Sequence, residues 1–129
     1  PVNGHVLIDY SMDKTTYFPT LDQYRYNPAL IIGGQEGEPI YASAEGLITG
    51  IEQSAQTGTT VTMDLGNGYS ASYGELKDLS VAEGQYVNAG DLIGYLSQPT
   101  KYYSVEGVNL YFEMEKDGNP VNPMDFMEQ

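Results

Sequence analysis

Residues 36–50, EGEPIYASAEGLITG, and residues 83–94, EGQYVNAGDLIG, repeat one pattern within a short chain. In each copy a Glu-Gly turn leads to an apolar residue and an alanine, and a later glycine opens a short apolar run that ends on glycine. Glycine allows the positive φ angles of tight turns and the close approach of crossing strands. The repeat is too short for a solenoid, and two copies are too few. It predicts a duplicated half-barrel of β-strands.

The rest of the chain carries strand patterns and little helix. Residues 29–32 form a continuous apolar run, and residues 59–65 alternate between apolar and polar. The Asn67-Gly68 pair between two such runs predicts a hairpin. We expect one helical turn from Pro123 and a turn over residues 19–25. Strands are expected at residues 6–8, 29–32, 40–44 paired with 46–51, 59–65, 69–76, 79–81, 85–87, 91–96 and 109–115. The fold class predicted is all-β, a single compact antiparallel sheet or partly open barrel.

Composition limits the classes of function. The formal net charge is −13, from 18 acidic and 5 basic residues, which argues against a nucleic-acid surface and against contact with anionic membranes. The chain has no cysteine and no apolar run long enough to span a membrane. It begins at Pro1 rather than Met, so we expect a trimmed ectodomain whose membrane anchor lies elsewhere in the full-length protein. Residues 1–23 are expected to pack as an N-terminal segment on a domain of residues 24–129.

Several of these motifs occur together in one known family. They are GEPIYA at residues 37–42, GNGY at 66–69, VAEGQYVNAGDLIG at 81–94, LYFE at 110–113 and GNPVNP at 118–123. In this order and spacing they resemble the lysostaphin/LytM-type zinc metallopeptidases, the glycyl-glycine endopeptidases of bacterial cell walls. The resemblance covers roughly residues 24–126. It implies a LytM-like β-domain with the duplicated hybrid motif, and zinc hydrolysis of peptidoglycan peptide bonds in active members.

The chemical positions of that family are all substituted here. By the resemblance, the three zinc ligands fall on Asn27, Ile31 and Tyr111, and the two catalytic histidines on Glu75 and Asn109. Catalytic zinc needs three protein ligands and an open position for water. A hydrocarbon has no lone pair, an amide is a poor zinc donor, and a phenol has to lose its proton first. We therefore expect a degenerate member with no zinc, no other cofactor and no catalytic residue. A carboxylate site for a hard cation at Glu75 and Asn109 stays open as an alternative.

A groove lined by aromatic and amide side chains is then expected where the zinc site was. Such groups bind peptides or sugars without chemistry, although the tyrosines could equally fill the vacated space. The groove candidates are Tyr73, Glu75, Tyr102, Tyr103, Asn109 and Tyr111.

The leading hypothesis is a non-catalytic domain on the bacterial cell surface. It would bind peptidoglycan peptides or an envelope protein, as a scaffold or regulator of wall remodelling or sporulation. The alternative is a wall metalloendopeptidase with a non-standard site. A swinging-arm carrier is disfavoured because none of the four lysines lies in a Met-flanked hairpin tip.

Overall fold

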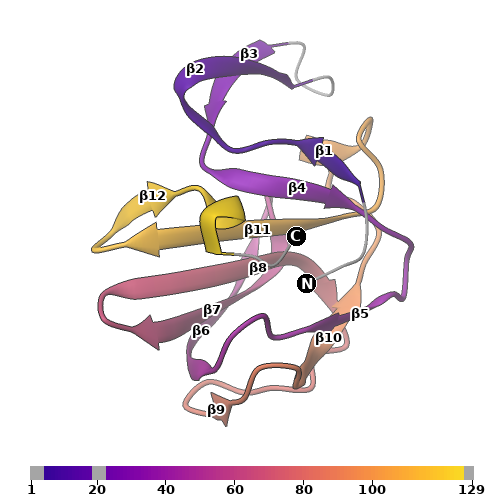
Figure 1. Cartoon of the computed structure of the whole chain (residues 1–129). Coiled ribbons are helices and arrows are strands. Elements are labelled where there is room, and N and C mark those ends of the chain that lie inside the picture. Colours follow the sequence, from indigo (N-terminus) through magenta and orange to yellow (C-terminus); the bar gives the residue numbers. More distant parts are fainter. Residues whose placement is uncertain (1–4, 19–22, 127–129) are drawn as a thin grey trace.

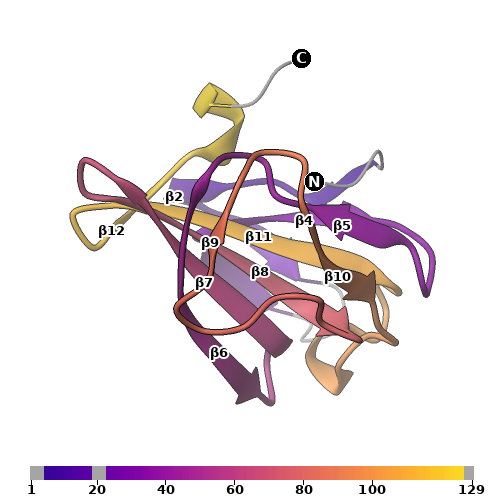
Figure 2. The ribbon, with the colours of Figure 1, turned by 90° about the horizontal axis from the view of Figure 1, so that it is seen from below.

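The computed structural model describes residues 5–18 and 23–126, and it is built almost entirely of antiparallel strands (Figure 1). Ten strands form one sheet, in which seven follow the order β1-β4-β11-β8-β7-β6-β9 and β5, β10 and β12 pair off this path. Strands β2 and β3 form a separate pair. Figure 2 shows β4, β11, β8, β7 and β6 side by side. The all-β prediction is confirmed. The elements are β1 (Val6–Ile8), β2 (Ser11–Phe18), β3 (Gln23–Asn27), β4 (Ala29–Gly33), β5 (Pro39–Tyr41), β6 (Gly46–Ser54), β7 (Gly58–Gly66), β8 (Tyr69–Lys77), β9 (Tyr86–Val87), β10 (Leu92–Leu96), η1 (Lys101–Tyr103), β11 (Asn109–Lys116), β12 (Asn119–Val121) and η2 (Pro123–Phe126).

The two copies of the sequence repeat pair with each other reciprocally. The first copy supplies β5 and the start of β6, and the second supplies β9 and β10. Strand β5 pairs with β10, and β6 pairs with β9. The turn glycines Gly37 and Gly84 have φ angles of 81° and 86°, a region that L side chains rarely adopt. The repeat is therefore a structural duplication, although the expected pairing of residues 40–44 with 46–51 is wrong, because each copy pairs with the other.

The β7–β8 hairpin forms where Asn67-Gly68 predicts it. Both turn residues have positive φ, 54° for Asn67 and 84° for Gly68, as a two-residue turn between twisted strands requires. Along β7, Val61 and Met63 are fully buried while Asp64 is exposed, which confirms the alternation predicted from sequence.

Two apolar clusters lie on the two sides of the sheet. The main core is formed by inward-facing residues of β4 to β11, among them Leu30, Ile48, Met63 and Phe112. A smaller cluster, called here the second core, consists of Ile8, Phe18, Ala29, Ile31, Tyr103 and Tyr111. In β4 the continuous apolar run is explained by this arrangement, because alternate residues enter different cores.

Some boundaries differ from the sequence-based expectation. Residues 23–25 belong to β3 rather than to a turn, while residues 19–22 lie outside the described part. Residues 79–81 form no strand, although Ser80 N–H donates to Ile93 O of β10 at 2.9 Å. The helical turn expected from Pro123 is present as η2. Within residues 5–18 and 23–126, no helix is long and apolar enough to cross a membrane.

Candidate functional site

The positions expected to hold zinc meet on the side of the sheet that carries the second core. Ile31 of β4 and Tyr111 of β11 are directly opposite each other in the strand pairing. Ile31 is fully buried and Tyr111 is 8% exposed. Because alternate residues of β4 face alternate sides, Ala29 enters the same cluster as Ile31. The centre of the expected site is thus a packed apolar cluster.

Asn27 lies at the end of β3 and is used as a structural bridge. Its side chain is buried, and Nδ2 donates to Asp9 O at 2.7 Å and to Ala29 O. Its Oδ1 accepts a long bond from Ala29 N at 3.4 Å. The amide therefore joins the segment after β1 to the start of β4, and both of its polar atoms are already occupied by the backbone.

Tyr111 is held as a neutral phenol. Its hydroxyl donates to Glu113 Oε1 at 2.6 Å. Burial raises the pKa of Tyr111 far above its ordinary value, and the negative charge of Glu113 raises it further. A phenolate, which is the form that could ligate a metal, is thus strongly disfavoured here.

A zinc ion of the family type does not fit these residues. Ile31 offers no donor atom, the Asn27 amide is bonded to backbone atoms, and Tyr111 stays protonated. Three protein ligands are needed to hold catalytic zinc, and these positions supply none. The described residues also contain no group of three or more His, Cys, Asp or Glu side chains that could hold a metal ion.

Glu75, at one catalytic position, is a fully buried carboxyl on a strained backbone. Its φ angle is 67°, in the left-handed region that a residue with a Cβ rarely occupies. Oε2 accepts a hydrogen bond from Thr100 N at 3.0 Å, whereas Oε1 is buried and has no hydrogen-bond partner in the described structure. Burial raises the pKa of Glu75, against a smaller lowering by the bond from Thr100. The geometry favours the neutral acid.

Asn109, at the other catalytic position, has the same kind of role. It is fully buried, and Nδ2 donates to Gly107 O at 2.8 Å, while Oδ1 has no partner among the described residues. Glu75 and Asn109 therefore tie down the two ends of one connection, residues 100–107. That connection carries Tyr103 into the second core. Both side chains therefore anchor this loop.

The structure brings most of the groove candidates together, but it does not leave their rings free. Tyr103 is 1% exposed, and its ring centroid is 6.4 Å from that of Tyr111 and 5.1 Å from that of Tyr102. Tyr73 lies apart from them, in the main core on the other side of the sheet. Its hydroxyl accepts from Ser43 N at 3.0 Å and its ring packs on Phe112.

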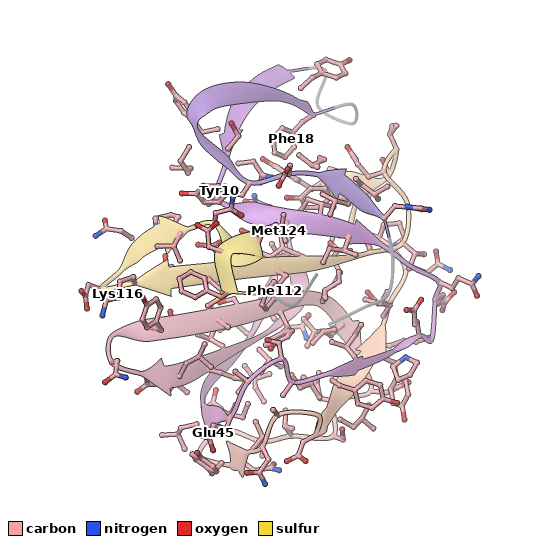
Figure 3. All side chains as sticks on the ribbon, in the orientation of Figure 1. Tyr10, Phe18, Glu45, Phe112, Lys116 and Met124 are labelled. Atoms are coloured by element: carbon pink, nitrogen blue, oxygen red, sulfur yellow. The ribbon has the colours of Figure 1, made fainter. Side chains whose placement is uncertain are left out.

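Sequence reasoning missed the residues that close the site. Phe18, at the end of β2, is buried in the second core with its ring centroid 6.5 Å from that of Tyr103. Figure 3 shows Phe18 between the β2–β3 hairpin and β4. Ile8 of β1 joins it. The run Tyr17-Phe18 gives no local signal of this, because the contact is made across the chain rather than within a strand pair.

Comparison with known proteins finds sequence matches over most of the chain. The sequence pattern of Peptidase family M23 matches residues 25–123. The chain is 31% identical to the DD-carboxypeptidase/endopeptidase Mpg of Neisseria meningitidis over 82% of its own length and 24% of the relative's. It is also 31% identical to the stage II sporulation protein Q of Bacillus subtilis, over 70% of its length and 31% of the relative's.

The fold agrees with these sequence matches. A structure of the SpoIIQ–SpoIIIAH pore-forming complex superimposes with a TM-score of 0.76 and 26% identity, covering 98% of this chain and 85% of that one. The present chain spans about a quarter of the length of the Mpg relative. The matched segment includes β4, β8 and β11. This chain belongs to Peptidase family M23.

Proposed function

We propose that this M23 domain is non-catalytic and serves in the bacterial cell envelope as a docking module. It would act on the outer side of the membrane, as a scaffold or regulator of wall remodelling or sporulation, and would use no zinc. The observation that carries this is the filling of the site: Ile31, Tyr103 and Tyr111 pack together where a metal and its water would be needed. A buried hydrocarbon at a ligand position removes both the metal and the room for a substrate carbonyl.

A sequence match and a structural match support a partner-binding role. The stage II sporulation protein Q is 31% identical over 90 residues, and the SpoIIQ structure is of a complex with SpoIIIAH. A protein partner in the envelope is the finer proposal, and peptidoglycan peptides are the other ligand class. The acidic charge favours a protein partner, because wall polymers are themselves rich in anionic groups.

The second candidate is a wall metalloendopeptidase with a non-standard site. It is favoured by the 31% identity to Mpg, a DD-carboxypeptidase/endopeptidase. It requires the second core to open and other residues to bind the metal. It predicts zinc or calcium retained through dialysis and release of peptide fragments from peptidoglycan.

The two candidates separate in one set of assays on the purified domain. Metal content is measured after zinc loading and dialysis, cleavage is measured on purified peptidoglycan, and binding is measured by co-sedimentation with walls. An active M23 peptidase serves as positive control. The proposal expects no retained metal and no cleavage. Metal at one ion per chain together with fragment release would establish the peptidase instead.

A further inference from the structure

One row of side chains crosses the outer face of the sheet, on the side away from the main core. The strand pairing places Glu115 opposite Ser70, and Ser70 opposite Asp64. It then places Asp64 opposite Leu47, and Leu47 opposite Tyr86. The five residues, from β11, β8, β7, β6 and β9, are called here the outer row: Glu115, Ser70, Asp64, Leu47 and Tyr86.

The outer row is open to solvent. Glu115 and Ser70 are half-buried and Asp64 is exposed. At the β9 end, Leu47 is 40% and Tyr86 is 60% exposed, so two large apolar side chains lie next to each other on the surface. The neighbouring row, formed by Glu113, Ser72 and Thr62, is half-buried and polar. A sheet face with an exposed apolar pair at one end and polar groups along its length has the composition of a docking surface.

The charge on this face has one sign. Strands β6, β7, β8 and β11 contain only two basic residues, Lys77 and Lys116, each the last residue of its strand. Both are engaged elsewhere, since Lys77 Nζ is 2.9 Å from Glu36 Oε2 and Lys116 Nζ lies 4.6 Å from the Tyr69 ring centroid. Figure 3 shows Lys116 at the tip of β11, while Glu45 lies at the β6–β9 end. There Glu45 Oε2 accepts from the Tyr86 hydroxyl at 2.8 Å.

Two of the carboxylates on this face, Glu113 and Glu115, interact with each other. Burial is the main cause of the raised pKa of Glu113, and repulsion by the charge of Glu115 and a hydrogen bond between the two side chains raise it further. On Asp64, Oδ1 accepts from Gly66 N at 2.9 Å, which leaves its other oxygen outward. Neither Glu115 nor Asp64 has a basic partner among the described side chains. A cationic ligand would relieve this repulsion, whereas a second copy of this chain, itself at −13, would increase it.

We propose that the outer row docks a basic segment of an envelope protein, with cationic side chains over Glu115 and Asp64 and an apolar side chain over Leu47 and Tyr86. The distances between the residues of the outer row set the sequence pattern expected of the bound segment. Neighbouring strands lie about 4.8 Å apart, so Glu115 and Asp64 are separated by about 10 Å, as are Asp64 and Tyr86. In the polyproline II conformation a chain rises about 3.1 Å per residue with three residues per turn, so side chains three residues apart lie on one face about 9 Å from each other. The pattern is Lys-x-x-Lys-x-x-Leu, crossing the strands. This inference rests on the proposed docking function.

The test is an NMR titration of the ¹⁵N-labelled domain with a peptide of that pattern, beside a Glu-x-x-Glu-x-x-Leu control peptide. We expect shifts confined to the amides of residues 46–48, 62–65, 70–72, 86–87 and 113–115. The double variant Asp64→Asn, Glu115→Gln should weaken binding about three- to tenfold, since exposed ion pairs are individually weak. Its matched control, Asp78→Asn with Asp125→Asn, removes the same charge from exposed positions off the row and should change affinity less than twofold. Both variants are checked for an unchanged amide spectrum.

Three results would overturn the inference. Shifts scattered over all acidic surfaces, or equal losses in the two double variants, would mean non-specific attraction. Concentration-dependent self-association through Leu47 and Tyr86 would assign the face to a second copy. Absence of peptide binding would remove the surface but leave the non-catalytic function standing. A positive metal and cleavage assay would instead remove the proposed function, whatever the titration gives.

Discussion

Replacing Ile31 by aspartate, the residue that the resemblance implies at this position in zinc-binding members, tests whether the site can still hold a metal. The change is Ile31→Asp, at a fully buried position packed against Phe18 and Tyr111. Removing the buried isoleucine loses about 1.5–3 kcal/mol of apolar burial. Leaving a carboxyl without a partner in that environment costs about 1–3 kcal/mol more, even when it takes up a proton. The expected loss is therefore about 2.5–6 kcal/mol, against a total free energy of unfolding of about 5–15 kcal/mol for ordinary domains.

Urea denaturation followed by circular dichroism measures this loss, and Ile31→Val is the matched control. The valine variant keeps the apolar character and should lose only about 0.5–1.5 kcal/mol. Both variants are measured with and without excess zinc. A metal that bound Asp at position 31 in the native state would restore about 2.7 kcal/mol at a concentration one hundred times its Kd. We expect no such rescue, because Asn27 and Tyr111 supply no further ligand. A loss below about 1 kcal/mol for Ile31→Asp, or a clear gain on adding zinc, would refute the reasoning.

Three further changes probe the anchors and the packing of the site. Because burial raises the pKa of Glu75 above its unfolded value, the native state holds an extra proton between the two pKa values, so the free energy of unfolding falls as pH rises above about 4.3. Glu75→Gln should flatten that fall and be the more stable protein at pH 7. Urea titrations over this pH range that show a steeper fall for the variant would contradict this. Tyr111→His restores one ligand only and should give neither bound zinc nor cleavage of peptidoglycan, so measurable turnover by this single variant would show that the motif was misplaced. Phe18→Ala should lower the free energy of unfolding by about 3–5 kcal/mol if the β2–β3 hairpin and the rest of the domain unfold together. Hydrogen exchange should then show that amide protection is lost first around Ile8 and Tyr103. Unchanged protection there would mean that the hairpin does not close the site.

The scaffold could be predicted from sequence because its signals are local. Asn67-Gly68 fixes a hairpin by its own backbone preference, and Val61 and Met63 alternate with polar residues over a single strand. The repeated Glu-Gly turns at Gly37 and Gly84 give the duplication. Such signals need no knowledge of distant residues, so the all-β fold follows from them.

The contents of the site could be predicted only in part. The resemblance places Asn27, Ile31 and Tyr111 at the ligand positions, and the pairing of Ile31 with Tyr111 brings two of them together. Tyr73, expected in the groove with these residues, lies instead in the main core. Strict alternation along β8 would place Tyr73 and Glu75 on one side, and the left-handed backbone at Glu75, with φ of 67°, breaks that alternation.

Long-range contacts account for what the sequence did not reveal. Phe18 reaches Tyr103 from a hairpin 85 residues earlier in the chain, and no local pattern marks that contact. The anchoring bond of Thr100 N–H to Glu75 depends on where one loop crosses the sheet. The left-handed backbone at Glu75, with φ of 67°, is equally invisible in a sequence that has no glycine at that position.

The most direct test of the account is the zinc content of the domain after loading. The wild-type protein is incubated with excess zinc near neutral pH, passed through gel filtration and analysed for metal, with an M23 peptidase that retains its histidines treated in parallel. The account predicts a full equivalent in the control and only background in this chain, because Ile31, Tyr103 and Tyr111 occupy the space as a packed cluster. One zinc per chain, retained on dialysis and lost in Asn27→Ala, would contradict it.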